Sequence, residues 1–246
     1  MKKIILSATL LLGGLSVYAQ QQPSKMTPES SELWDPAPRV VSTTAAVPSD
    51  AIVLFDGKNF DNWVSGRDGK SPVGWTIADN AMTVKKGAGE IQTKQEFENF
   101  QLHIEWRTPA EVKGNGQGRG NSGIFMQGIY ELQVLDSYNN TTYSNGQAGS
   151  IYKQTMPLVN ASKKPGEWQV YDVIYTAPRF NKDGQMATPA YITVFHNGVV
   201  VQNHTAIQGT TPYVGRPTWT PHGKGPLKLQ DHGDAVSFRN IWVREL

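Results

Sequence analysis

From Ala51 to the C-terminus, short runs of alternating or β-branched residues recur between Gly, Asn and Pro, and no stretch has the period of a long amphipathic helix. The runs expected to form strands are 52–55, 75–77, 81–84, 90–93, 100–108, 122–127, 130–136, 168–176, 190–196, 199–204, 227–230 and 236–244. So many short strands without helices predict an all-β fold, an antiparallel two-sheet sandwich of the jelly-roll kind.

Two dipeptides, and a shift in the apolar alternation of the last expected strand, predict the local backbone geometry. Asp79-Asn80 and Asn197-Gly198 each separate two expected strands, and Asn-Gly suits a two-residue type I′ hairpin turn. In the last expected strand the apolar residues change phase midway, which predicts a β-bulge near Arg239-Asn240.

The N-terminus predicts export. Residues 1–19 combine a charged start, a short apolar run and a small residue, Ala19, before the expected cleavage point, as in a secretory signal peptide. The apolar run is too short to span a bilayer, so no membrane span is expected and the mature protein should be periplasmic or secreted. Residues 20–50, rich in Gln, Pro, Ser and Thr, are expected to form a linker or loosely ordered arm before a domain at 51–246.

Charge and cysteine content narrow the possible partners and the sources of stability. The chain has 23 basic and 21 acidic residues, and loss of Lys2 and Lys3 with the signal would leave 21 of each. A neutral chain gives no electrostatic reason to expect a nucleic acid partner. The chain has no cysteine, so stability must come from the core of the sandwich. The oligomeric state is left open.

Three expected connections are longer than a compact sandwich needs: 109–121, 137–167 and 209–226. Loops of this length are usually functional or disordered, and the second and third carry several aromatic residues. If 100–108, 122–127 and 130–136 form a meander, the first two long loops leave the sheet at the same end. These loops are therefore expected to border a site.

Polar residues that alternate with apolar ones are the first candidates for chemistry. In 100–108, His103, Glu105 and Arg107 share one face, which is either a solvated sheet surface or the floor of a pocket; the solvated surface is the commoner outcome. In 130–136, Glu131 and Gln133 share one face.

Asp136 and His232 each have two interpretations. Either the strand ends at Leu135, with Asp136 capping a turn, or a bulge brings Asp136 beside Glu131, where two carboxylates could serve acid/base chemistry or hold a cation. His232 follows Asp231 at the end of another strand, as a base, a metal ligand or a member of a hydrogen-bonded turn. The sequence has no zinc-spaced ladder, phosphate loop or nucleophile elbow.

Seven short motifs follow one another along the domain: LFDGK at 54–58, NSGIF at 121–125, YELQVLDSY at 130–138, QAGSIY at 147–152, PGEW at 165–168, HNGV at 196–199 and QDHG at 230–233. This series resembles the 3-keto-disaccharide hydrolase domain family, which includes 3-keto-glycoside lyases, over about 51–246. The resemblance implies a concanavalin A-like lectin or glucanase fold and action on glycosides oxidised at carbon 3 of the sugar. It also implies elimination chemistry aided by a divalent metal of unknown identity.

The site residues follow from the resemblance. Those expected to act as base, acid or metal ligand are Glu131, Asp136 and His232, with Glu105 as a reserve carboxylate. Those expected to bind the sugar or stabilise an oxyanion are Arg107, Gln133, Tyr138, Tyr152, Lys153 and Gln154. Trp219 is added for its position in the third long loop, where it either contacts a ligand or anchors the loop.

Two other functions fit the same fold. One is a carbohydrate-binding module in which Trp63, Trp168 or Trp219 forms an aromatic platform. The other is an ordinary glycosidase, which needs two carboxyl groups about 5 to 9 Å apart across the scissile bond. A deep polar pocket would favour an enzyme, and a flat aromatic strip would favour the module.

Overall fold

The computed structural model describes residues 26–246 and divides the chain into two units, Met1–Val40 and Val41–Leu246. The described part of the first unit contains one short 3-10 turn, η1 (Pro28–Ser31), and no strand. The predicted signal peptide, residues 1–19, lies outside the described residues. Within the second unit, Asp50 Oδ2 accepts a hydrogen bond from Arg244 Nε at 2.7 Å. No helix in residues 26–246 is long and apolar enough to cross a membrane.

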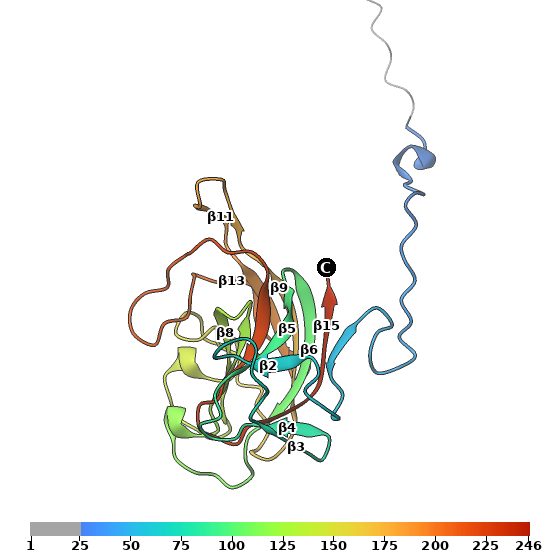
Figure 1. Cartoon of the computed structure of the whole chain (residues 1–246). Helices are drawn as coiled ribbons and strands as arrows, with labels where there is room; N and C mark the ends of the chain where they lie inside the picture. Colours follow the sequence, from blue (N-terminus) through green and yellow to red (C-terminus); the bar gives the residue numbers. More distant parts are fainter. Residues whose placement is uncertain (1–25) are drawn as a thin grey trace, which may run out of the picture. The chain divides into compact units, whose positions relative to one another are not determined.

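The second unit is a sandwich of two antiparallel sheets (Figure 1). The larger, eight-stranded sheet has the order β13-β12-β9-β6-β15-β4-β3, and β1 also pairs with β15. Its strands are β1 (Ile52–Phe55), β3 (Thr76–Ala78), β4 (Ala81–Thr83), β6 (Phe100–Arg107), β9 (Gln169–Thr176), β12 (Tyr191–His196), β13 (Val199–Ala206) and β15 (Ser237–Glu245).

The smaller sheet has five strands in the order β2-β5-β14-β7-β8. They are β2 (Trp63–Ser65), β5 (Ile91–Phe97), β14 (Gly225–Leu229), β7 (Ser122–Met126) and β8 (Tyr130–Val134). A separate hairpin pairs β10 (Arg179–Phe180) with β11 (Met186–Thr188). The remaining regular elements of the described domain are two 3-10 turns, η2 (Gly116–Gly118) and η3 (Ser144–Gly146).

Alternation along the strands builds the core between the two sheets. In β6 every second residue is buried, so Leu102, Ile104 and Trp106 point inward. Leu132 and Val134 of β8 point inward from the smaller sheet. The core is therefore continuous between the layers, and a polar group within it needs a hydrogen-bond partner. The fold predicted from the alternation is confirmed.

A buried hydroxyl ties the sheets together. Tyr171 of β9 donates to the carbonyl of Gln133 in β8 at 2.9 Å, and burial raises the pKa of the Tyr171 hydroxyl well above its usual value. The hydroxyl therefore stays protonated and able to donate. This bond helps to fix the position of β8 relative to the larger sheet.

The predicted local features are present. Asp79 and Asn80 have φ of 51° and 58°, and Asn197 and Gly198 have φ of 53° and 82°, as a type I′ turn requires. In β15 the register shifts between Arg239 and Trp242, so the expected bulge is confirmed. Three short strands, β2, β10 and β11, were not predicted.

The predicted meander is wrong, because β6 belongs to the larger sheet whereas β7 and β8 pair in the smaller one. The two long loops nevertheless meet. Asn140 Oδ1 accepts from the Gly116 amide at 2.8 Å, and Asn140 Nδ2 donates to the Gly116 carbonyl at 3.0 Å. The loop after β6 and the loop after β8 therefore share one end of the domain.

Candidate active site

The outer face of the smaller sheet carries four residues in register, which we call the transverse row: Gln92, Lys228, Phe125 and Glu131. Gln92 pairs with Lys228, Lys228 with Phe125, and Phe125 with Glu131, across β5, β14, β7 and β8. Because paired residues of antiparallel strands point to the same face, the four side chains form a continuous row across the outer surface of the smaller sheet.

Glu131 ends this row as a buried carboxylate, with 5% of its surface exposed. Burial, with a smaller contribution from the negative charge of Glu90, raises the pKa of Glu131 to about 8. The nearby Lys228 ammonium is paired with Glu90 at 3.2 Å instead. A carboxyl group with so high a pKa can accept or donate a proton near neutral pH, as general acid–base chemistry requires.

A cavity of about 200 Å³ opens above Glu131. Its lining residues come from two strands, β7 and β8, and from four connecting segments: Asn121, Phe125, Glu131, Tyr152, Thr211, Tyr213, Gln230 and His232. Two of the loops are tied to Glu131 itself, because its amide donates to Thr211 Oγ1 at 3.1 Å and its carbonyl accepts from the Tyr152 amide at 3.1 Å. The loops are therefore held where their side chains meet the carboxylate.

Two polar side chains in the cavity are free to bind a ligand. His232 is exposed, and its ring makes no hydrogen bond to any described residue. Gln230 Oε1 is buried without a partner in the described chain. A buried acceptor without a hydrogen-bond donor costs free energy of folding. The position of Gln230 Oε1 in the same cavity as Glu131 therefore suits a hydrogen bond from a bound ligand.

Tyr152 supplies a hydroxyl to the same cavity. Its oxygen lies 2.6 Å from the hydroxyl of Tyr143. Burial above all, together with this hydrogen bond and the charge of Glu131, raises the pKa of Tyr152 above its usual value. The phenol therefore stays protonated and can donate a hydrogen bond to a developing oxyanion.

Lys153 and Gln154 lie beside the cavity, but they hold the loops. Lys153 Nζ donates to the Tyr213 carbonyl at 2.6 Å and lies 4.1 Å from the centre of the Tyr213 ring. Gln154 Nε2 donates to the carbonyls of Gly209 and Thr210, at 3.0 and 3.3 Å. Neither residue lines the cavity. Both side chains therefore hold the loop in position, and the expectation that they bind sugar hydroxyls is not met.

Gln133 is too deeply buried to reach a sugar. Turned one way, its amide donates to Gln117 Oε1 and Asn121 Oδ1 at 3.1 and 3.3 Å. Turned the other way, it donates to Glu131 Oε1 at 3.2 Å and to the Ser122 carbonyl at 3.3 Å. Gln133 therefore supports the site from beneath the carboxylate.

Asp136 is separated from Glu131. The strand β8 ends at Val134, so no bulge returns Asp136 to the outer face, and its Oδ2 accepts from Arg119 Nε at 2.7 Å. Arg119 Nη2 donates in turn to the carbonyl of Tyr138 at 2.9 Å, so Tyr138 also belongs to this buried ion-pair network.

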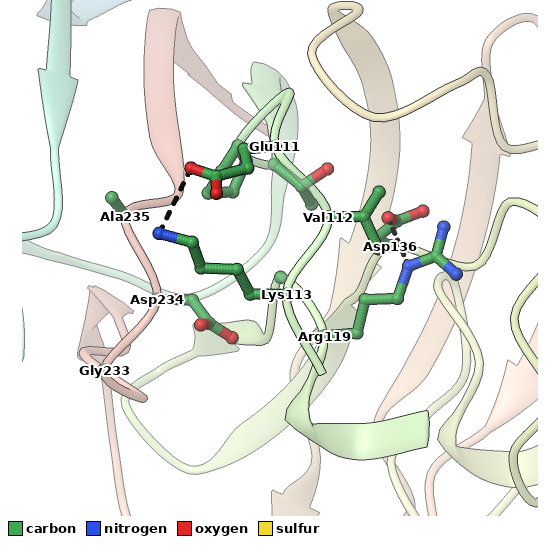
Figure 2. A pocket seen from close by; sticks show the side chains of 11 residues that line it. Glu111, Val112, Lys113, Arg119, Asp136, Gly233, Asp234 and Ala235 are labelled. Carbon is green, nitrogen blue, oxygen red and sulfur yellow. Dashed lines mark hydrogen bonds and ion pairs between the residues drawn. The ribbon is translucent and has the colours of Figure 1, made fainter. Parts of the chain in front are cut away.

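The ion pair borders a different cavity, of about 260 Å³ (Figure 2). Its charged lining residues are Glu111, Lys113, Arg119, Asp136 and Asp234. Figure 2 shows Glu111 paired with Lys113 on one side and Arg119 with Asp136 on the other.

Glu105 and Arg107 lie on the outer face of the larger sheet, on the other side of the core from Glu131. Glu105 Oε2 accepts from Arg239 Nε at 2.6 Å. Trp168 is flanked by the guanidinium groups of Arg107 and Arg239, at 4.7 and 4.1 Å from its ring centre. The expectation that Glu105 and Arg107 share a site with Glu131 is wrong, because periodicity along β6 does not indicate which sheet the strand joins.

Trp219 is an anchor of the third long loop. Its ring packs on Tyr130 and Phe180, with centres 5.7 and 6.2 Å apart, and it is absent from the cavity lining. His222 of the same loop lies 2.6 Å from the Tyr130 hydroxyl. These contacts hold the loop that carries Thr211 and Tyr213 over the site.

The expected metal ligands do not come together. Among residues 26–246, no three His, Asp or Glu side chains are arranged to hold a metal ion. Glu131 and His232 share one cavity, whereas the carboxylate of Asp136 is occupied by Arg119 and by the Tyr138 amide. These residues do not fit a closed metal site.

Comparison with known proteins decides the family. A model of the 3-keto-alpha-glucoside-1,2-lyase-like domain matches residues 50–244. The chain belongs to this family. A curated 3-keto-disaccharide hydrolase from Bacteroides thetaiotaomicron is 29% identical over 243 residues, covering 81% of each chain. The resemblance seen in the seven motifs is confirmed.

Solved structures agree with this family and with the sandwich fold. A crystal structure of a candidate glycosyl hydrolase from Parabacteroides distasonis is 54% identical, with a TM-score of 0.87 over 92% of this chain and 99% of that one. A second candidate glycosyl hydrolase from that organism, 22% identical, has a TM-score of 0.56 over 80% of this chain and 94% of its own, which supports the fold alone. The 3-keto-alpha-glucoside-1,2-lyase-like chain is therefore a carbohydrate-active, glycoside hydrolase-like protein.

Several cavity residues were not predicted from the sequence: Asn121, Phe125, Thr211, Tyr213 and Gln230. Asn121, Phe125 and Gln230 lie in two of the motifs that carry the resemblance, and Tyr213 lies in an aromatic-rich long loop. Motif membership was the signal that could have identified the first three. Thr211 had no distinguishing signal.

Proposed function

We propose that this chain is an exported enzyme that cleaves glycosides bearing a keto group at carbon 3, with Glu131 as the base. The observation that carries the proposal is the buried Glu131 carboxyl at the floor of a polar cavity, with a protonated Tyr152 and a free His232 beside it. The family match and the name of the Bacteroides relative support the choice of a 3-keto sugar.

The chemistry begins with proton transfer. A ketone at carbon 3 makes the hydrogen on carbon 2 acidic, and the Glu131 carboxylate takes this proton while the electron pair moves into an enolate. The Tyr152 hydroxyl donates a hydrogen bond to the enolate oxygen, and Gln230 Oε1 accepts a hydrogen bond from a sugar hydroxyl. The low exposure of the carboxylate strengthens these interactions.

Elimination then releases the aglycone. The enolate restores the carbon 3 ketone, a double bond forms between carbons 1 and 2, and the bond from carbon 1 to the glycosidic oxygen breaks. His232 donates a proton to the departing oxygen. Water adds across the double bond, with hydroxyl on carbon 1 and hydrogen on carbon 2, which completes net hydrolysis.

The two other functions have less support. An ordinary glycosidase needs two carboxyl groups across the bond, and Glu131 is the one carboxylate among the described residues that line its cavity. The binding-module prediction relied on a tryptophan platform, but Trp63 is 2% exposed, Trp168 is flanked by two guanidinium groups on the other sheet, and Trp219 anchors a loop.

The deciding experiment compares turnover of a chromogenic 3-keto-glucoside with that of the plain glucoside. We expect cleavage of the keto substrate alone and its loss in Glu131→Gln. Glu105→Gln serves as the matched control, because it removes a carboxylate from the opposite sheet. Binding of sugars without cleavage of either substrate would support the module instead. A parallel measurement with a chelator, and then with added divalent ions, tests the metal dependence that the family resemblance implies.

A further inference from the structure

We define the rim of the Glu131 cavity as the exposed lining residue Tyr213, its sequence neighbour Val214, and Tyr143, which contacts the lining residue Tyr152. Tyr213 is 74% exposed and Val214 is 82% exposed, although Tyr213 also lines the cavity. Tyr143 is 40% exposed and contacts Tyr152. Single exposed apolar residues are ordinary, but a group of them at the opening of a polar cavity marks a binding surface.

The loop that presents Tyr213 is held in place at its base. The Thr210 amide donates to the Thr218 carbonyl at 2.9 Å, and the Thr218 amide donates to Thr210 Oγ1 at 3.2 Å. Gln154 binds two carbonyls at the start of the loop, and Lys153 binds the Tyr213 carbonyl. The exposed ring is therefore pre-organised, which lowers the entropic cost of binding a partner.

The polar groups of this rim are largely occupied by one another. The hydroxyl of Tyr143 is bonded to that of Tyr152, and the Lys153 ammonium is bonded to the Tyr213 carbonyl while lying over the Tyr213 ring. What remains for a ligand is mainly the Tyr213 ring, with its own hydroxyl, and the Val214 side chain. Such a surface favours a flat apolar group over a second sugar, whose hydroxyls would need hydrogen-bond partners.

We propose that this rim binds an aromatic aglycone, so that the preferred substrates are aryl glycosides oxidised at carbon 3. The inference rests on the sugar-cleaving function proposed above, which places the sugar against Glu131 at the cavity floor. The substituent on carbon 1 then extends toward the mouth, where Tyr213 offers a stacking partner. Tyr213 is in this view the residue that determines aglycone specificity.

The test measures binding of unoxidised glucosides, which lack the acidic hydrogen and are not expected to be cleaved. Phenyl, cyclohexyl and methyl glucosides of one anomeric configuration, with a glucose disaccharide, are compared by calorimetry and as inhibitors of 3-keto-glucoside turnover. We expect the phenyl glucoside to bind about five- to tenfold more tightly than the methyl glucoside, with cyclohexyl between them. Tyr213→Ala should reduce the phenyl preference to about twofold or less, because it should weaken binding of the phenyl glucoside more than binding of the methyl glucoside.

The matched control is Tyr191→Ala, because Tyr191 stacks on His204 in the larger sheet, away from the cavity. This variant should keep the phenyl preference. Equal binding of phenyl and methyl glucosides, or tighter binding of the disaccharide, would overturn the inference even if 3-keto-glucosides are cleaved. A phenyl preference that depends on Tyr213 would support the aromatic site even if cleavage fails, and then the proposed function alone would be wrong.

Discussion

The carboxylate of Glu131 occupies the space that a side chain at Gly123 would need. A Cβ placed on Gly123 would lie 2.5 Å from Glu131 Oε1 and 2.9 Å from Phe125 Cε2. The two residues lie on adjacent strands, with Gly123 paired to Gln133, two positions from Glu131. Glycine is therefore required here by the position of the carboxylate.

Gly123→Ala should displace Glu131 and lower kcat/KM for a 3-keto-glucoside by about tenfold or more, because small misplacements of catalytic groups are costly. Circular dichroism should show that the sandwich remains folded. Gly118→Ala is the control, since a Cβ there meets nothing within 4 Å. Unchanged kinetics in Gly123→Ala would mean that the position of Glu131 does not matter to the reaction.

Glu131→Gln should abolish proton abstraction and reduce kcat by about 10² to 10⁴-fold. The same variant should be more stable than the original protein at pH 8, by on the order of 3 kcal/mol. The folded-state pKa, about 8, lies above the ordinary 4.5, so folding stability falls as pH rises from 4.5 to 8. A glutamine at position 131 does not ionise, so it carries no such pH-dependent cost of burial.

Denaturant unfolding at pH 4 and pH 8, in chelator, measures this stability difference. The advantage of Glu131→Gln should be small at pH 4 and grow toward pH 8. A pH-independent difference would contradict the raised pKa of Glu131.

The pH dependence of kcat/KM should separate base from acid catalysis by Glu131. If Glu131 acts as a base, the profile rises with pH and has its midpoint near the pKa of about 8. Glu90→Gln should move the midpoint to lower pH, because it removes the negative charge that helps to raise the pKa of Glu131. Glu96→Gln in β5, the strand that begins just after Glu90, is the control. A falling limb near pH 8 would assign Glu131 as an acid instead.

Asp136→Asn should act on stability more than on chemistry. The Asp136 and Arg119 side chains are 3% and 14% exposed and 2.7 Å apart, so loss of one partner should cost about 3 kcal/mol of unfolding free energy. Replacing both, as Arg119→Met with Asp136→Leu, should recover part of that loss. A variant Asp136→Asn with unchanged melting temperature but lost turnover would return Asp136 to the catalytic group.

Much of the fold follows from local pattern. Alternation in β6 correctly assigned Leu102, Ile104 and Trp106 to the core, and Asn197-Gly198 correctly located a hairpin, because side-chain direction and turn geometry depend on neighbouring residues. The motif series also identified the family.

The site was only partly predictable. The sequence placed Glu131, Tyr152 and His232 among the functional candidates, and all three line one cavity. It could not separate them from Glu105 or Asp136, since a polar residue on a strand has the same local signature whichever sheet the strand joins.

Taken alone, the sequence determined which residues face the core, where chain reversals occur and which family the chain resembles. Tertiary structure decided that Glu131 has no cationic partner among residues 26–246 while Asp136 is paired with Arg119, and that Tyr213, which lines the cavity, is held by Lys153. The physical reason is that burial and ion pairing, which set the pKa and the chemistry of each group, arise from contacts between segments far apart in the chain.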